Sequence, residues 1–179
     1  MAFSYSPKIV NDGLVLYLDA ANSKSYPGTG TTWSDLSRGG NNGTLTNGPT
    51  FNSGNGGSIV FDGTNDYVNF PEISPPNTIN NFSYGLWFYP TVTISPGSLT
   101  TFSMLIEVQD QRFGSSRPDN YIYFLTNGEL LFATFTPTNN LASLQTTWVS
   151  NEWYNVFCTY ESSTGTKKLF INGELENSV

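Results

Sequence analysis

Apolar and polar residues alternate along residues 82–89, and a period of two residues predicts a β-strand with one side toward a core. The positions predicted to face that core are Phe82, Tyr84, Leu86 and Phe88. The opposite side mixes small residues with large aromatics, so it is either a second packing surface or a binding platform. Its residues are Ser83, Gly85, Trp87 and Tyr89.

Residues 153–160 alternate in the same way. The pattern places Tyr154, Val156, Cys158 and Tyr160 inward and Asn155, Phe157 and Thr159 outward.

Two further stretches predict hairpins. Residues 121–135 contain Asn127-Gly128, which supplies the positive φ angles that a tight primed turn requires. Residues 166–171 are predicted to pair back onto residues 153–160, and Asn172-Gly173 begins another tight turn.

The N-terminal half carries shorter signals. Residues 14–18 form a continuous apolar run, which predicts a buried strand. Residues 23–55 are rich in Gly, Asn, Thr and Pro and predict a long ordered loop that Trp33 and Leu36 anchor, with a short strand at residues 43–46.

Residues 59–70 predict two short strands on either side of a polar turn, in a hairpin-like corner. The turn brings together three oxygen donors of the type that Ca²⁺ prefers: Asp62, Asn65 and Asp66. Either these side chains cap their own turn or they hold a weak Ca²⁺ site, with Asp19 or Asn22 from a neighbouring loop as a further ligand.

No stretch keeps a helical period over three turns, so the pattern predicts an all-β fold of about ten short strands at the spacing of a two-sheet sandwich. The chain has 179 residues, of which 37% are apolar and 15% aromatic. This length and composition predict one domain over residues 1–179 with a substantial core.

Charge and cysteine content exclude several classes of function. The net charge is −7 and the seven Lys and Arg residues are scattered, so nucleic acid is not expected as a partner. No segment is apolar enough for membrane insertion, and residues 1–7 do not resemble a secretory signal. The single cysteine, Cys158, excludes an internal disulfide, and without any histidine to activate it we expect a small buried hydrophobe.

A series of segments, taken in order, resembles the concanavalin A-like laminin G superfamily. The most specific are the block Phe61-Asp62-Gly63-Thr64-Asn65-Asp66-Tyr67-Val68 and the late Asn172-Gly173-Glu174, and the others are residues 14–19, 33–37, 41–44, 82–88, 153–156 and 169–171. This resemblance implies a two-sheet antiparallel jelly roll whose edge loops often bind glycans or Ca²⁺. It also implies a non-catalytic role in most members.

The N-terminal half is similar to structural proteins of tailed bacteriophages. That similarity implies a non-catalytic capsid decoration, tail or fibre protein of a virion assembled in the host cytoplasm. Its partners would be other virion subunits or copies of itself, with cell-surface glycan as a further ligand. The alternative is a Ca²⁺-dependent, lectin-like carbohydrate-binding module of a bacterial surface protein, located outside the cell or on its surface.

Family members usually continue past Asn172-Gly173-Glu174 into strands that close the sheet. The turn at Asn172-Gly173 itself needs a returning strand, and only six residues follow it. We therefore expect one of three arrangements at the C-terminus: a short returning strand, an exposed edge that a neighbouring subunit covers, or a chain that lacks its closing strands.

Catalysis is not expected. Related jelly-roll glycosidases use paired carboxylates, commonly alternating along one strand, and no Glu-x-Asp-x-Glu spacing occurs here, since Glu107 and Asp110 lie three residues apart. The lack of histidine also excludes Ser-His and Cys-His nucleophiles and His-based zinc sites.

Sugar binding needs exposed aromatic rings with amide or carboxylate groups nearby. The candidate ligand-binding residues are Trp87, Tyr89 and Trp148. The alternative for each is a place in the core between the sheets.

Overall fold

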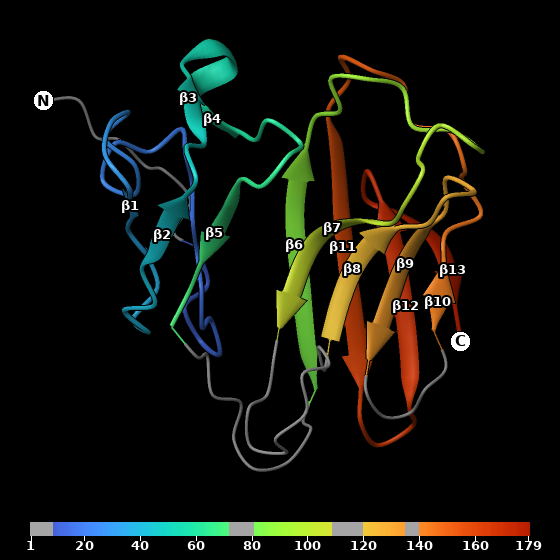
Figure 1. The fold of residues 1–179 in the computed structure, drawn as a ribbon. Coiled ribbons are helices and arrows are strands. Elements are labelled where there is room, and N and C mark those ends of the chain that lie inside the picture. The colour runs from blue at the N-terminus through green and yellow to red at the C-terminus, as the bar shows by residue number, and fades with distance from the viewer. Residues whose placement is uncertain (1–8, 72–80, 109–119, 135–139) are drawn as a thin grey trace, which may run out of the picture. The chain divides into compact units, whose positions relative to one another are not determined.

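The computed structural model describes residues 9–71, 81–108, 120–134 and 140–179, and its architecture is all-β (Figure 1). The chain divides into two compact units, Met1–Ile73 and Ser74–Val179, which are described separately. The single domain over residues 1–179 stays a prediction. Within the described residues, no helix has the length and apolar character needed to cross a membrane.

The first unit contains two small antiparallel sheets. One has the strand order β1-β2-β5, and the other pairs β3 with β4. The elements are β1 (Thr32–Trp33), β2 (Gly43–Thr46), β3 (Thr50–Asn52), the 3-10 helix η1 (Gly54–Gly56), β4 (Ser58–Val60) and β5 (Tyr67–Asn69). The strand predicted at residues 43–46 is therefore confirmed.

An aromatic cluster forms part of the packing of this unit. The buried Tyr26 ring lies 5.5 Å from the Phe51 ring and 6.5 Å from the Trp33 ring, measured between centroids. Trp33 thus anchors the loop that precedes β2, as predicted.

The corner at residues 58–70 is not a hairpin. Strands β4 and β5 flank the polar turn, but β4 pairs with β3 and β5 pairs with β2, through Ile59 opposite Phe51 and Val68 opposite Leu45. The turn therefore leads from one small sheet to the other.

The strand predicted at residues 14–18 is absent, and Val15 in its middle is exposed. A single backbone hydrogen bond, from Leu36 N–H to Tyr17 O at 2.8 Å, joins this stretch to residues 35–41, and side chains make the other contacts. Asp35 Oδ1 accepts a hydrogen bond of 2.9 Å from Tyr17 N–H, and the carbonyl oxygen of Val15 accepts hydrogen bonds from Ser37 Oγ at 3.1 Å and Asn41 Nδ2 at 2.8 Å.

The second unit contains two four-stranded antiparallel sheets (Figure 1). Sheet A has the strand order β13-β12-β11-β6, and sheet B has the order β10-β9-β8-β7. Sheet A consists of β6 (Phe82–Phe88), β11 (Tyr154–Glu161), β12 (Thr166–Ile171) and β13 (Glu174–Ser178). Sheet B consists of β7 (Ser103–Val108), β8 (Asn120–Phe124), β9 (Leu130–Thr134) and β10 (Leu141–Ala142).

The core of the second unit lies between these two sheets. Phe82 of sheet A meets Phe132 of sheet B edge to face with centroids 6.2 Å apart, and Phe88 meets Phe124 in the same way at 5.5 Å. The predicted inward positions of β6 and β11 all contribute to this core. The predicted all-β, two-sheet sandwich is confirmed.

Cys158 is fully buried in this core, as predicted. Burial raises the pKa of its thiol to about 12. The pKa of its cross-strand neighbour Tyr84 is also raised to about 12, first by burial and then by the charge that Cys158 would carry as a thiolate. Both groups are therefore neutral at physiological pH.

The two Asn-Gly turns differ. Asn172 and Gly173 both have positive φ, 53° and 86°, and connect β12 directly to β13 as a tight primed turn. In the β8–β9 hairpin only Gly128 has positive φ, at 83°, and its N–H donates to Leu125 O at 3.0 Å. That hairpin is confirmed, but its turn is longer than the predicted one.

Strand β13 supplies the short return expected after Asn172-Gly173. It is also held from the sheet B side, because Glu176 Oε1 accepts hydrogen bonds from the N–H groups of Leu144 at 2.8 Å and Gln145 at 2.6 Å. Asn177 Nδ2 donates to Ala142 O at 2.8 Å. These contacts connect β13, at the edge of sheet A, with β10 and the residues that follow it, at the edge of sheet B.

Candidate functional site

The outward side of sheet A carries large aromatic side chains that the core does not use. Trp87 on β6 is 65% exposed and Phe157 on β11 is 42% exposed. We call this surface the aromatic face, and its residues are Trp87, Tyr89, Trp153, Phe157 and Phe170.

The pairing of strands arranges the aromatic face in three rows. The first row is Tyr89 with Trp153, the second is Trp87 opposite Asn155, and the third is Gly85, Phe157, Phe170 and Leu175. Successive rows are two residues apart along β11, which corresponds to about 7 Å.

Two exposed rings pack together in the first row. The centroids of Tyr89 and Trp153 are 5.2 Å apart, and these residues immediately flank the stack of the partly buried Phe88 on the buried Tyr154. The Tyr89 hydroxyl donates to Asn151 Oδ1 at 3.3 Å. The first row is therefore anchored both by ring packing and by a hydrogen bond.

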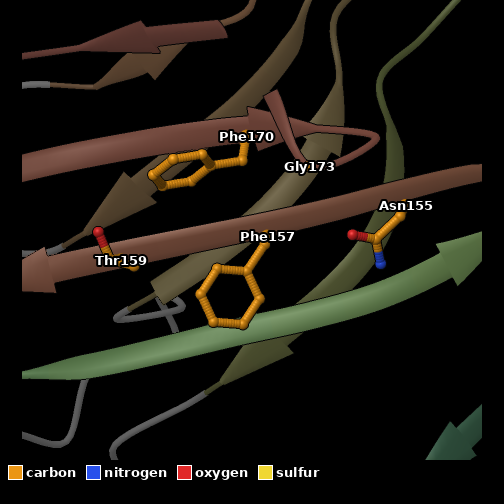
Figure 2. Close-up of a pocket in the computed structure, with 5 residues that line it drawn as sticks. All are labelled: Asn155, Phe157, Thr159, Phe170 and Gly173. Carbon is orange, nitrogen blue, oxygen red and sulfur yellow. The ribbon is translucent and has the colours of Figure 1, made fainter. Parts of the chain in front are cut away.

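The third row forms the floor of a shallow depression with a volume of about 420 Å³ (Figure 2). Its lining residues are Asn155, Phe157, Thr159, Phe170 and Gly173. Figure 2 shows the Phe157 and Phe170 rings side by side on one side of the sheet, with Phe157 leaning toward β6. Apolar rings and small polar groups thus share one open surface.

The amide of Asn155 is held in a defined orientation beside these rings. Its Nδ2 donates to Leu86 O at 3.2 Å, and its backbone N–H donates to Asn172 Oδ1 at 2.9 Å. In Figure 2 the Asn155 oxygen points along the sheet toward Phe157. This orientation places an acceptor between the second and third rows.

The prediction that Trp148 contacts a ligand is wrong, because its side chain has 0% exposure. Its ring packs against Phe88, Phe124 and Tyr154 with centroid distances of 5.1–5.5 Å. The indole N–H donates to Gly128 O at 2.9 Å. Trp148 is a core residue, whereas Trp87 and Tyr89 lie on the surface.

The loop with the predicted metal ligands is exposed and capped by its own carboxylates. Asp66 Oδ2 accepts a hydrogen bond of 3.0 Å from Asp62 N–H, and Asp62 Oδ1 accepts one of 2.7 Å from Thr64 N–H. These contacts are those of turn capping, and they use one oxygen of each carboxylate.

The backbone carbonyl of Asn65 accepts a hydrogen bond from Asn47 Nδ2 at 2.7 Å. The further candidates Asp19 and Asn22 accept local hydrogen bonds from Ala21 N–H and Lys24 N–H, respectively. Among the described residues, no group of three His, Cys, Asp or Glu side chains could hold a metal ion. A Ca²⁺ site at Asp62, Asn65 and Asp66 stays a prediction.

The sequence pattern indicates two of the five residues of the aromatic face, Trp87 and Tyr89, as ligand-binding. It places Phe157 outward without connecting it with Trp87, and it does not indicate Phe170 or Trp153. The signal was present in the strand register, because pairing residues 166–171 back onto β11 places Phe170 beside Phe157.

No curated protein matches the sequence. One solved structure with similarity is that of "a putative carbohydrate binding protein" from Bacteroides ovatus, with 16% identity and a TM-score of 0.40. The match covers 69% of this chain and 39% of the other, so the chain spans well under half of that protein.

A family model also matches the sequence, over residues 62–179. Neither match concerns a virion protein, so the virion role stays a prediction. The model covers more than half of the sequence and includes all the strands of sheets A and B. The chain therefore belongs to the concanavalin A-like lectin/glucanases superfamily.

Proposed function

We propose that this protein is a non-catalytic carbohydrate-binding module and that the aromatic face is its binding surface. The observation that carries the proposal is the exposure of Trp87 and Phe157 on the same side of sheet A, in adjacent rows. Large apolar side chains that lie exposed next to one another are typical of a binding surface, whereas single exposed apolar residues are common on any protein surface.

The chemistry of the face suits a sugar. Aromatic rings pack against the apolar faces of pyranose rings, and amide and hydroxyl groups bond to sugar hydroxyls. Asn155 and Thr159 provide such groups beside Phe157. Membership in a superfamily of lectins and glucanases supports the same ligand class.

The lack of acidic side chains among the described residues of the aromatic face supports binding without catalysis. Glycoside hydrolysis requires two carboxyl groups on either side of the scissile bond. The three rows of the aromatic face, all within the described residues, contain no Asp or Glu. Of the acidic pair considered from the sequence, Glu107 lies on β7 in sheet B, and Asp110 lies outside the described residues.

The test is binding of the full chain to a panel of immobilised polysaccharides, with the double variant Trp87→Ala/Phe157→Ala. We expect the wild type to be retained on at least one polysaccharide and the variant to lose retention while its thermal melt stays cooperative. The matched control is Phe102→Ala, because Phe102 is an exposed aromatic residue that packs on Tyr123 of sheet B.

Two results would contradict the proposal. The first is the lack of retention of the wild type on any polysaccharide, and the second is equal retention of the wild type and the double variant. Equal loss in the double variant and in Phe102→Ala would indicate non-specific adsorption through exposed aromatic residues.

A further inference from the structure

We infer that the ligand of the aromatic face is the interior of a neutral polysaccharide chain, which lies along β11 across all three rows. This inference rests on the proposed function and specifies its substrate class. It follows from the length of the face, its open shape and its lack of charge.

The length of the face exceeds what one sugar ring can cover. Trp153 in the first row and Phe157 in the third are four residues apart, which corresponds to about 13 Å along an extended strand. Each row presents at least one aromatic ring, and Asn155 adds an amide in the middle row. Consecutive sugar units of one chain can contact consecutive rows.

The depression at the third row is open, and its lining residues come from β11, from β12 and from the turn at Gly173 (Figure 2). Recognition of a chain end would require a wall that stops the ligand. Beyond Phe157 along β11 the next outward residue is Thr159, and its partner on β6 is Ser83, so both of these side chains are small. A ligand chain can therefore continue past the third row without meeting a large side chain of β6 or β11.

Charge favours a neutral ligand. The three rows contain no charged residue, and the nearest cation in register is Lys168, opposite Thr159 in the row beyond Phe157. The whole chain carries a net charge of −7, which repels uronate-containing or sulfated polymers. A single lysine at the end of the face does not offset this repulsion.

The experiment measures affinity against chain length. The probes are a β-1,3-glucan, a β-1,4-xylan and an α-1,6-dextran, each as the polymer and as oligosaccharides of increasing length, with alginate as the anionic polymer. For the neutral polysaccharide that the protein binds, we expect the affinity to rise with oligosaccharide length over the first few sugar units and then level off. We expect alginate to bind more weakly than that neutral polymer.

Row variants provide the sharper readout. Trp153→Ala removes a ring from the first row, and Phe170→Ala removes one from the third. Each variant should bind the longest oligosaccharide about tenfold more weakly than the wild type does, as expected for the loss of one ring contact. For the shortest oligosaccharide that the wild type binds, the loss of affinity should be much smaller. The matched control Phe102→Ala should leave the whole length profile unchanged.

The outcomes separate the inference from the proposed function. Affinity that does not change with chain length, or complete competition by a monosaccharide, would overturn chain binding while leaving carbohydrate binding in place. Binding to alginate at least as tight as to the neutral polymer would overturn the neutral class. Lack of binding to every probe would overturn both.

Discussion

The ring of Phe157 occupies the space above Gly85, its cross-strand partner in sheet A. A methyl group at Gly85 would lie 2.9 Å from Phe157 Cδ2 and 3.3 Å from Cε2, which is closer than van der Waals contact allows. The small residue on β6 therefore determines how Phe157 lies on the aromatic face.

Gly85→Ala should weaken carbohydrate binding without unfolding the protein. The new methyl group must displace the Phe157 ring, so we expect a severalfold loss of affinity for the polysaccharide that the wild type binds, of the size of one perturbed ring contact. The free energy of unfolding should change by less than about 1 kcal/mol, because alanine suits a strand better than glycine and offsets part of the steric cost. Binding and urea unfolding are measured on the same samples.

The control for this variant is Ser83→Ala, which changes an exposed outward residue of the same strand two positions away. It should bind as the wild type does. Wild-type affinity in Gly85→Ala would show that the position of Phe157 does not matter for binding.

Trp148 and Trp87 should respond to mutation in opposite ways. Trp148→Phe removes ring volume from the core and leaves Gly128 O without its indole donor, so the free energy of unfolding should fall by about 2 kcal/mol or more. Trp87→Phe keeps an exposed aromatic ring and should change stability by less than about 0.5 kcal/mol. Comparable losses of stability in the two variants would contradict the assignment of Trp148 to the core and Trp87 to the surface.

Residue alternation made sheet A predictable. On β6 and β11 every second residue enters one continuous core, so the inward and outward sides follow directly from the sequence. The sequence predicts that residues 166–171 pair with residues 153–160 but not the register of that pairing, which places Phe170 beside Phe157. The function of an outward aromatic residue depends on neighbours from other strands, and alternation within one strand does not contain that information.

Other features were not predictable because local irregularities change the register. In β7 the pairing shifts between Met104 and Ile106, so Met104 is exposed while Leu105 and Ile106 pack against the core. Strict alternation along β7 would place Met104 and Ile106 on the same side. A β-bulge inserts one residue into the alternation and reverses the side that each later residue faces.

Trp148 illustrates a different limit. Composition cannot separate a tryptophan that fills a core from one that binds a ligand, since both types occur in sandwiches rich in aromatic residues. Its burial arises from packing between β6, β8 and β11 and from the hydrogen bond to Gly128 O, which depend on contacts between distant segments.

Asp35 should make the first unit sensitive to acid. Its carboxylate accepts hydrogen bonds from Tyr17 N–H, from Asn41 N–H, and from both the N–H and the Oγ of Ser37. Partial burial raises the pKa of Asp35, but these hydrogen bonds outweigh that effect and hold the pKa below its ordinary value of 3.8.

The pKa of Asp35 is lower in the folded state than in the unfolded state. The carboxylate therefore stabilises the fold fully at pH values above its unfolded-state pKa, and this stabilisation is lost as the pH falls through its folded-state pKa. Asp35→Asn should remove this pH dependence and cost about 1 kcal/mol near neutral pH, since an amide nitrogen cannot accept the hydrogen bonds made to one of the two oxygens. Amide hydrogen exchange at Tyr17, Ser37 and Asn41 is the direct measurement and should be faster in the variant.

The exposed Asp12→Asn provides the charge-matched control in the same unit and should leave these exchange rates unchanged. Equal exchange rates at the three amides in the wild type and Asp35→Asn would contradict the role of Asp35.

The predicted Ca²⁺ site can be tested on the same chain. Turn capping uses Asp62 Oδ1 and Asp66 Oδ2, so a cation at this loop would have to be held by the remaining carboxylate oxygens together with Asn65. Few protein ligands on an exposed loop correspond to an affinity no tighter than about 10⁻⁴–10⁻³ M. If the prediction is correct, about 10 mM Ca²⁺ should raise the melting temperature, and EDTA should reverse the rise.

Asp66→Asn separates metal binding from turn capping, because its amide oxygen can still accept the hydrogen bond from Asp62 N–H while the charge is lost. The variant should melt like the wild type in EDTA and should show no rise with Ca²⁺. A wild type that melts at the same temperature in Ca²⁺ and in EDTA would leave turn capping as the role of Asp62 and Asp66. The proposal for the aromatic face does not rest on that result, since all five of its residues lie on sheet A or beside its strands, in the second unit.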